Sequence, residues 1–160
     1  MRITLIAMLL TASAIPAPGA TATGQFDVTA TVLDNCAVTA SDLAFGNYAP
    51  SSGSPVTAST TLQVTCTPSL AYSIALDGGT TTGAVAARAM SDGGSGQLTY
   101  GLYKSSGYST IWGDGSGVTQ TVAGTGNGAA QPHTVHGRIP ASQFVAAGSY
   151  TDSITVTVTY

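Results

Sequence analysis

Residues Gly148–Tyr160 read GSYTDSITVTVTY, and their alternation of apolar residues with threonines is the clearest pattern in the sequence. Strict alternation predicts a half-buried antiparallel strand, because successive side chains of a strand point to opposite faces of its sheet. The apolar face consists of Ile154, Val156, Val158 and Tyr160. No turn and no partner strand follow in the sequence, so we expect one edge of this strand to need a partner from elsewhere, since exposed apolar edges promote aggregation.

The same alternation predicts a strand near the other end of the sequence, at Gly24–Leu33. One face of this segment carries Phe26, Val28, Ala30 and Val32, whereas the other is polar. We regard it as the best candidate partner for the C-terminal strand, either folded back within one molecule or supplied by another copy.

The first 22 residues have the features of a signal peptide. Arg2 supplies a positive charge, the apolar run Ile3–Ile15 follows, and Ala20 and Ala22 occupy the −3 and −1 positions of a cleavage site. The run is too short and too often interrupted by polar residues and proline to span a bilayer comfortably, although an uncleaved anchor is the alternative. We therefore expect export through the Sec pathway and a mature chain that begins near Thr23.

The composition of residues 23–160 narrows the class of protein. This length is enough for one domain with a single core. Three basic residues stand against seven aspartates, a net charge of −4, and the basic residues form no cluster. Nucleic acid and anionic membranes are therefore not expected partners, because both attract basic surfaces. Charged residues are only 7% of the sequence, and the abundant Thr, Ser and Gly suit an exported β-rich protein better than a helical one.

Cys36 and Cys66 are the only cysteines in the sequence. Export places them in a compartment where disulfides persist, and two cysteines allow one pairing within the chain, so we predict a Cys36–Cys66 disulfide. On the chain-entropy model, closing a loop of about 31 residues stabilises the fold by roughly 3–4 kcal/mol. The prediction requires the strands that carry the two cysteines to lie close together.

Further strands are predicted between the two terminal ones. Cys36–Phe45 reads as a strand interrupted by polar residues, and Gly78–Gly96 as loop or weak strand with Ala84–Met90 as one candidate helical fragment. The remaining predicted strands are Ala58–Thr67, Leu70–Asp77, Leu98–Lys104, Val118–Val122 and His133–Ile139. Seven or eight strands without a confident helix predict an all-β, immunoglobulin-like β-sandwich, with a jelly roll or a small barrel as alternatives.

The sequence contains no recognisable catalytic or metal-binding pattern. His133 and His136 are the only histidines, and a strand places them on opposite faces. The aspartates are scattered among turns, where Asx turns explain them. We therefore predict no catalytic residues, no metal, no cofactor and no small-molecule substrate. Trp112 and the seven tyrosines leave open an exposed platform for sugars.

Several motifs together resemble the spore coat protein U family, which includes the subunits of archaic (Csu-type) chaperone–usher pili. The motifs are Thr23-Gly24 before an alternating strand, Leu62-x-Val64-x-Cys66, Trp112-Gly113-Asp114-Gly115, Gly137-Arg138-Ile139-Pro140-Ala141 and the Thr/Val strand that ends in Tyr160. The resemblance extends over essentially all of residues 23–160. Two departures occur, Ser142 where Gly is expected and Ala146 where Pro is common.

The resemblance implies an incomplete immunoglobulin-like domain that lacks its last strand. In such pili a periplasmic chaperone lends a strand during transit to the outer-membrane usher, and the N-terminal strand of the next subunit replaces it in the fibre. Carried onto this sequence, residues 23–35 are the donor segment, with Phe26, Val28, Ala30 and Val32 as the inserted side chains. Residues 36–160 are a single pilin domain, whose groove is edged by Ile154, Val156, Val158 and Tyr160.

The function that the resemblance implies is a structural subunit of a surface pilus, used in attachment and biofilm formation. The subunit would pass through the periplasm to a fibre outside the cell, with other pilus subunits, the chaperone and the usher as partners. One alternative is a self-complemented secreted spore-coat or matrix protein, whose N-terminal strand fills its own groove. Another is a secreted carbohydrate-binding module or a small secreted hydrolase on a sandwich scaffold.

Overall fold

The computed structural model describes residues 19–160. The chain separates into two units, Met1–Val32 and Leu33–Tyr160. In the first unit, the described residues contain no helix and no strand, and their side chains are exposed. Phe26, Val28 and Val32 are each more than 80% exposed. The alternating segment thus lacks the strand pairing that its sequence predicts, because a strand forms only against a partner for its backbone groups. Residues 1–18 of the predicted signal peptide lie outside the described residues.

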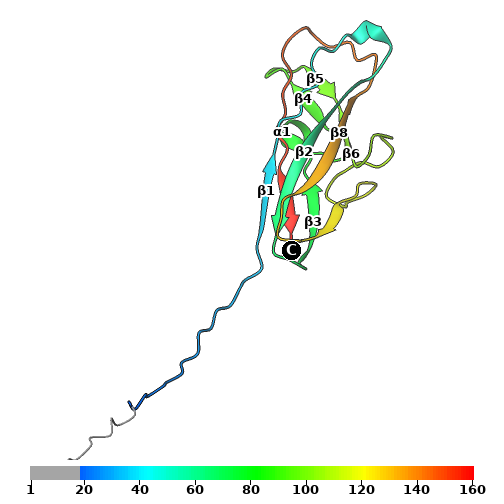
Figure 1. Ribbon diagram of the computed structural model, residues 1–160. Coiled ribbons are helices and arrows are strands. Elements are labelled where there is room, and N and C mark those ends of the chain that lie inside the picture. The colour runs from blue at the N-terminus through cyan, green and yellow to red at the C-terminus, as the bar shows by residue number, and fades with distance from the viewer. Residues whose placement is uncertain (1–18) are drawn as a thin grey trace, which may run out of the picture. The chain divides into compact units, whose positions relative to one another are not determined.

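The second unit is a sandwich of two main sheets (Figure 1). The larger sheet has the antiparallel order β1-β2-β8-β6, and its strands are β1 (Cys36–Ala40), β2 (Val56–Cys66), β8 (Gln131–Ile139) and β6 (Gly101–Tyr103). The other has the order β7-β3-β9, with β7 (Val122–Thr125), β3 (Ala71–Leu76) and β9 (Val156–Thr159). No strand pairing joins the two sheets in residues 19–160, so the predicted immunoglobulin-like sandwich is confirmed over a closed barrel.

Three short elements complete the unit. A two-stranded sheet is formed by β4 (Ala89–Ser91) and β5 (Gln97–Thr99). The helical elements are η1 (Pro50–Ser52) and the single turn α1 (Gly79–Thr82). Among the described residues, no helix has the length and apolar character needed to cross a membrane.

The core lies between the main sheets, where the inward residues of each strand alternate as predicted. Its buried members include Leu62, Val64 and Cys66 of β2, Ile74 and Leu76 of β3, and Val135 and Ile139 of β8. Trp112 is 1% exposed and donates its indole N–H to the carbonyl of Ile74 at 3.0 Å. The Trp112 motif therefore serves the core, and its ring is not part of a sugar-binding platform.

Some predicted elements differ in the structure. The strand predicted at Leu98–Lys104 is broken at Tyr100 into β5 and β6, which belong to different sheets, although Leu98, Tyr100 and Leu102 are all buried. Alternation of side chains persists through the break, so the sequence pattern does not reveal it. The two strands predicted around Pro68, β2 and β3, likewise lie in opposite sheets.

Two predictions were wrong. The strand predicted at Val118–Val122 instead begins at Val122 as β7, and Val118 is 76% exposed. The helical fragment predicted at Ala84–Met90 is absent, and the only helical turn of that region is α1. Its threonines and glycine have no strong helix propensity. The backbone N–H groups of Thr80 and Thr81 donate hydrogen bonds to the distant Asp152 carboxylate, which holds this turn in place and is not encoded in the local sequence.

Candidate functional site

The two main sheets each leave one edge strand open on the same side of the domain. β1 pairs only with β2, and β9 pairs only with β3. β1 and β9 lie next to each other, as the blue and red strands of Figure 1 show. A gap in the strand order therefore lies between β1 and β9.

The backbone groups that face this gap follow from the strand pairing. The Asp77 N–H donates to the Thr155 carbonyl at 3.1 Å, so Thr155 directs its backbone groups toward β3. Because these directions alternate along a strand, Ile154, Val156 and Val158 direct theirs toward the open edge. On the other side, the Thr67 N–H donates to the Asn35 carbonyl at 3.0 Å. Cys36, Val38 and Ala40 of β1 are therefore the residues that face the gap.

The same residues direct their side chains into the sandwich. Ile154, Val156 and Val158 are half-buried and alternate with exposed threonines, as the sequence predicts. Tyr160 lies beyond the last paired residue of β9 and is 55% exposed. Within residues 19–160, no backbone hydrogen bond joins β1 to β9. The gap thus combines open backbone edges with partly exposed apolar side chains.

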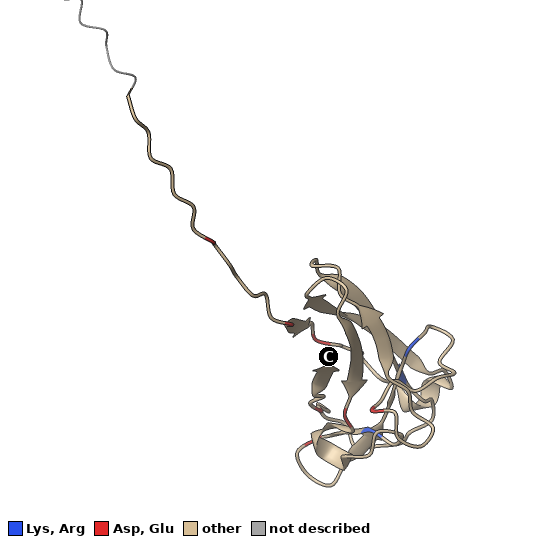
Figure 2. Cartoon of the chain, turned by 90° about the horizontal axis from the view of Figure 1, so that it is seen from below, with Lys and Arg blue, Asp and Glu red and all other residues tan. Residues whose placement is uncertain are grey.

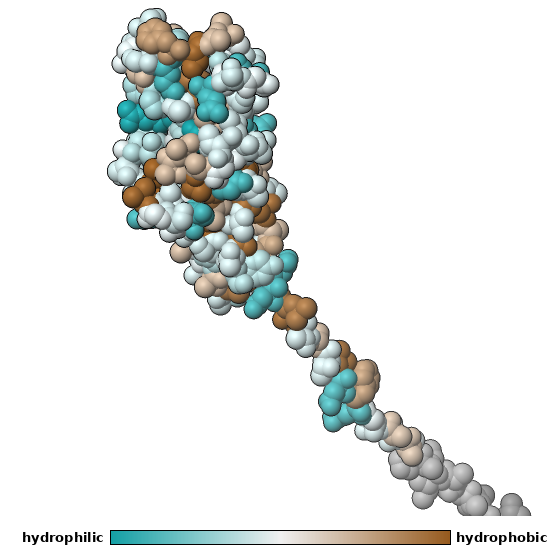
Figure 3. Space-filling view, turned by 180° about the vertical axis from the view of Figure 1, so that it is seen from behind, coloured by the Kyte–Doolittle hydropathy of each residue, from teal (hydrophilic) through white to brown (hydrophobic). Residues whose placement is uncertain are grey.

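A groove occupies this gap, and we call it the acceptor groove. One part of the groove is a cavity of about 430 Å³, whose walls come from the segments 40–45 and 150–156. The core residues Leu62, Leu76, Leu102 and Val135 also line this cavity. A second cavity of about 800 Å³ continues it, since both are lined by Leu43, Phe45, Met90 and Tyr150. Apolar side chains are visible between polar ones on the surface of the domain in Figure 3.

Gly137 of β8 shapes one wall of the acceptor groove. A Cβ atom at this position would lie 2.7 Å from the Phe45 ring and 2.9 Å from Leu43. Both contacts are closer than real Cβ atoms make, so the absence of a side chain lets Leu43 and Phe45 lie against the sheet. The glycine of the Gly137–Ala141 motif is therefore a packing requirement of the groove.

The other wall is held in place by the carboxylate of Asp152. Its Oδ1 accepts hydrogen bonds from the N–H and hydroxyl groups of Thr80 and Thr81, at 2.9–3.2 Å. Its Oδ2 accepts the Tyr100 hydroxyl at 2.7 Å. A Cβ atom on Gly79, where φ is 77°, would clash with this carboxylate. Burial opposes ionisation of Asp152, but the hydrogen bonds from Tyr100, Thr81 and Thr80 outweigh burial and lower its pKa.

Asp77 follows β3, the strand that pairs with β9, and holds the same wall in place from there. Its Oδ1 accepts the backbone N–H groups of Gly79 at 3.0 Å and Thr155 at 2.9 Å. Burial raises the pKa of Asp77, whereas the bonds from Thr155 and Gly79 and the nearby Arg88 charge lower it, with a net decrease. Sequence reasoning missed both carboxylates. The available signal was Asp152, a charged residue in phase with Ile154 and Val156 on the inward face.

Arg88 is a buried cation behind this wall. It is 1% exposed and donates to the carbonyl oxygens of Leu76, Asp77 and Trp112 at 2.8–3.1 Å. Figure 2 shows the Lys and Arg positions of the domain in blue and the Asp positions in red, and both are sparse. Arg88 therefore joins the end of β3 to the segment around Trp112 and supports the wall that Asp77 holds.

The predicted disulfide is present between Cys36 and Cys66. The two cysteines face each other as the first pair of the β1–β2 ladder. The bond therefore secures β1 at the residue where the domain begins to pair, and β1 is one edge of the acceptor groove.

The two histidines lie on opposite faces of β8. His133 is half-buried between the sheets, where its Nε2 lies 2.9 Å from the Tyr72 hydroxyl. His136 faces outward, opposite Tyr103 in the ladder. Residues 19–160 contain no group of three or more His, Cys, Asp or Glu side chains arranged to hold a metal ion.

We expect acid to weaken the fold through His133. Burial lowers the pKa of this histidine, and a neutral ring protonated on Nδ1 accepts the Tyr72 hydroxyl on Nε2. As the pH falls, the unfolded chain therefore protonates His133 before the folded chain does. The contribution of His133 to the free energy of unfolding is constant above about pH 6.5 and falls below it. The check is the urea midpoint at about pH 8 and about pH 5.5. His133→Gln should reduce the difference and His136→Gln should not; equal losses in wild type and His133→Gln would contradict the assignment.

Comparisons with known proteins agree with this geometry. The model of the Spore Coat Protein U domain family matches residues 22–157. No curated protein matches the sequence. The chain is similar to a chain in the crystal structure of the CsuC–CsuE chaperone–tip adhesion subunit pre-assembly complex from the archaic chaperone–usher Csu pili of Acinetobacter baumannii, with 25% identity and a TM-score of 0.57.

That similarity covers 81% of this chain and 40% of the other, so the chain spans less than half the length of its structural relative. The family model extends over the exposed N-terminal segment, the disulfide, β1 and the start of β9, and it ends before Val158 and Tyr160. The chain therefore belongs to the Spore Coat Protein U domain family.

Proposed function

We propose that the protein is a structural subunit of a chaperone–usher pilus and polymerises by donor-strand complementation. The observation that carries this proposal is that one chain contains both a groove that lacks a strand and a segment with the alternation needed to fill it. The chain has an acceptor groove with two open strand edges, and an exposed alternating segment with no strand partner. The segment is the donor, and it enters the groove of another copy.

The spacing of the two parts supports insertion. Phe26, Val28, Ala30 and Val32 recur every second residue, which places them about 6.6 Å apart in an extended strand. Ile154, Val156 and Val158 follow the same period along the acceptor groove. A strand placed between β1 and β9 can donate and accept hydrogen bonds on both sides and join the two sheets.

The register of the inserted strand decides whether its backbone hydrogen bonds and its apolar burial form together. A shift by one residue would turn the polar side chains of the donor into the groove and its apolar side chains to solvent. The bonds to both edges and the cover over Leu62 and Leu76 form only in the inward register. Insertion is therefore selective for segments with this alternation.

The chemistry of the groove also indicates the partners. An open apolar edge is an aggregation hazard before assembly, so a periplasmic chaperone that lends a strand suits an exported subunit of this kind. We propose cleavage after residue 22, a donor segment at 23–35 and a pilin domain at 36–160. Export then leads through the periplasm and an outer-membrane usher to a surface fibre, which acts in attachment and biofilm formation without catalysis.

The test is electrophoresis in SDS without boiling, on purified mature protein and on a deletion that lacks residues 23–33. Donor-strand polymerisation is expected to give a ladder for the mature protein that collapses on boiling. The deletion is expected to give no ladder. A monomer that is stable with the segment and unfolds without it would overturn the proposal in favour of a self-complemented coat or matrix protein.

A further inference from the structure

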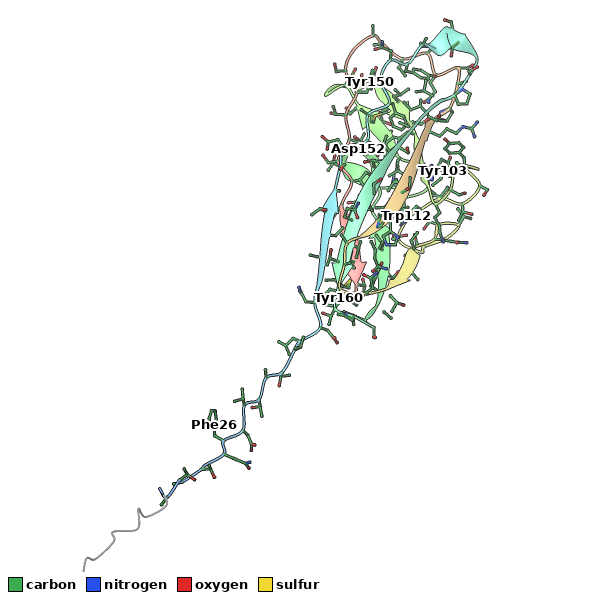
Figure 4. The ribbon with its side chains drawn as sticks, in the orientation of Figure 1. Phe26, Tyr103, Trp112, Tyr150, Asp152 and Tyr160 are labelled. Atoms are coloured by element: carbon green, nitrogen blue, oxygen red, sulfur yellow. A yellow bond between two sulfur atoms is a disulfide. The ribbon has the colours of Figure 1, made fainter. Side chains whose placement is uncertain are left out.

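The cations that lie outside the core are found together, at the edge of the larger sheet away from the acceptor groove. Residues 19–160 contain three basic residues, and one of them, Arg88, is buried. Of the other two, Lys104 directly follows β6, and Arg138 of β8 faces Gly101 of β6 in the ladder. In the order β1-β2-β8-β6, β6 is the edge strand opposite β1, and Figure 4 shows Tyr103 on this side of the domain.

Two tyrosines accompany Arg138 on the outward face of the sheet. Arg138 points outward, because its neighbours Gly137 and Ile139 are buried. Its guanidinium carbon lies 5.5 Å from the centroid of the Tyr108 ring, a cation–π contact. The Tyr103 and Tyr108 rings meet edge to face, with centroids 5.5 Å apart. We define the cation–tyrosine patch as five partly exposed residues, Tyr103, Lys104, Tyr108, His136 and Arg138.

The backbone near the patch shapes its tyrosines. A Cβ atom on Gly101 would lie 2.6 Å from the Tyr103 hydroxyl oxygen, so the absence of a side chain there lets the Tyr103 ring lie over the sheet. Tyr108 has a φ of 52°, in the left-handed region that few residues other than glycine adopt. Its N–H donates to the Ser105 carbonyl at 3.1 Å, which closes the turn. The fold thus holds an aromatic ring against Arg138 in an uncommon conformation, which is often a feature of functional surfaces.

No acidic side chain of the domain neutralises the patch. The Lys104 ammonium donates to the neutral side-chain oxygen of Gln120 at 3.1 Å, and within residues 19–160 neither Lys104 nor Arg138 forms an ion pair. The four strands of the larger sheet contain no aspartate or glutamate. A chain with a net charge of −4 over residues 23–160 therefore has one sheet face whose only charged side chains are basic. Charge complementarity indicates an anionic partner for this face.

The surface around the patch is open and bears hydroxyl groups. Across the β2–β8 ladder, Thr57 faces Arg138 and Ser59 faces His136, and both are exposed. Thr134 continues the outward row along β8. None of the five patch residues lines the two cavities described above. A small ligand usually requires enclosure in a cavity, whereas an extended polymer can make contacts along an open face.

We infer that the cation–tyrosine patch binds an acidic polysaccharide, with a uronate carboxylate on Arg138 and Lys104. The planar guanidinium of arginine matches a carboxylate with two parallel hydrogen bonds. A tyrosine offers an apolar ring and a hydroxyl, which suit the C–H face and the hydroxyl groups of a sugar. Nucleic acid fits less well, because its affinity comes from many phosphates neutralised together, and this face has two cations in an acidic domain.

This binding does not depend on donor-strand polymerisation. The patch lies on the outward face of β8 and at β6, whereas a donor would enter between β1 and β9. The patch therefore remains uncovered when the acceptor groove is filled. In a polymer each copy would present one patch, so that sites of low affinity act together on one polysaccharide chain.

The test is binding of the purified mature protein to immobilised polygalacturonate. The matched ligand is its methyl ester, which has the same sugar chain without the charge. Wild type should bind the acid, more weakly as salt is raised, and should bind the ester little. Arg138→Gln should lower the affinity by about tenfold or more, because a charge-assisted hydrogen-bond pair is lost. Arg138→Lys should give an intermediate affinity, since the charge remains and the planar fork does not.

Asn127→Asp is the matched control for Arg138→Gln. Both variants make the net charge more negative by one unit, but Asn127 lies in the turn between β7 and β8, at the other end of β8. An aspartate there can still accept the Ala129 N–H, which the Asn127 side chain accepts at 2.9 Å. Asn127→Asp should therefore bind polygalacturonate nearly as wild type does. Urea midpoints and SDS ladders should be the same for wild type and both variants, which separates lost binding from lost folding or assembly.

Several results would overturn the inference. Equal affinity of Arg138→Gln and Asn127→Asp would show that the patch is not the site, and equal binding of the acid and the ester would show that charge is not recognised. Failure of wild type to bind both polygalacturonate and hyaluronan would exclude acidic polysaccharides as the ligand class. Tighter binding to a single-stranded DNA oligonucleotide than to either polysaccharide would assign the patch to nucleic acid. Absence of an SDS ladder from wild type would overturn polymerisation alone.

Discussion

Val28→Asp is expected to abolish the SDS-resistant ladder while the domain stays folded. Val28 is 84% exposed in the unassembled chain, so the change should alter monomer stability by no more than about 0.5 kcal/mol. In the proposed donor-strand complex, the same position would face an apolar core. There the change removes about 1.5–3 kcal/mol of apolar burial and adds several kcal/mol for an unpaired buried carboxylate. The measurement is ladder formation together with a urea unfolding curve of the monomer.

Thr29→Asp is the matched control for Val28→Asp. It adds the same charge to the same segment, one residue further along, on the face that points to solvent in the inward register. Thr29→Asp should therefore polymerise at close to the wild-type yield. If Val28→Asp did so as well, the assignment of the donor face would be wrong.

The Val28→Asp protein should also shorten wild-type fibres. Its acceptor groove is intact, so it can receive a donor, but its own donor cannot enter a groove. Mixed with wild type in equal amounts, it should end growing chains and shift the ladder to short species. A mixture that retains the wild-type length distribution would show that the variant groove is not used.

The double variant Cys36→Ala, Cys66→Ala is expected to lose about 2–5 kcal/mol of stability, the usual effect of removing a native disulfide from a small secreted domain. This is a large share of the roughly 5–15 kcal/mol that stabilises a typical domain. The bond closes the loop from Cys36 to Cys66, and its two cysteines are the first pair of the β1–β2 ladder. Because Cys66 is buried, its truncation also leaves a small cavity. Urea midpoints of the variant and of wild type under reducing and oxidising conditions measure the effect.

The same variant separates two roles of the disulfide. If the bond also secures β1 as an edge of the acceptor groove, ladder formation by the surviving folded protein should be slower than in wild type. Reduced wild type should match the variant within the effect of the lost side-chain volume. A stability loss below about 1 kcal/mol would contradict the proposed contribution of the loop closure.

The sequence predicted the strands whose burial alternates without interruption. β2 and β8 lie where the pattern placed them, and Ile154, Val156 and Val158 of the C-terminal segment are half-buried as alternation predicts, whereas Tyr160 is 55% exposed. The disulfide followed from two cysteines in an exported chain. These inferences succeed because the period of apolar residues is a local property, set by the geometry of a single strand.

The elements that failed are those whose conformation depends on distant groups. α1 forms where Asp152, more than seventy residues away, accepts the backbone N–H groups of Thr80 and Thr81. The break at Tyr100 divides one alternating run between two sheets, and Val118 is exposed although it fits the pattern. Alternation reports which side chains face inward but not which strand provides the partner.

The sequence by itself determined the all-β class, the inward faces of the main strands, the disulfide pair and the unpartnered alternation at both ends of the chain. Only the tertiary structure decided that the edge strands β1 and β9 of the two sheets lie next to each other, that the acceptor groove lies between them, and that Asp77 and Asp152 hold one wall of it. The physical reason is that a strand's inward face is set by side chains two residues apart. Its place at an edge depends on every other strand in the sheet.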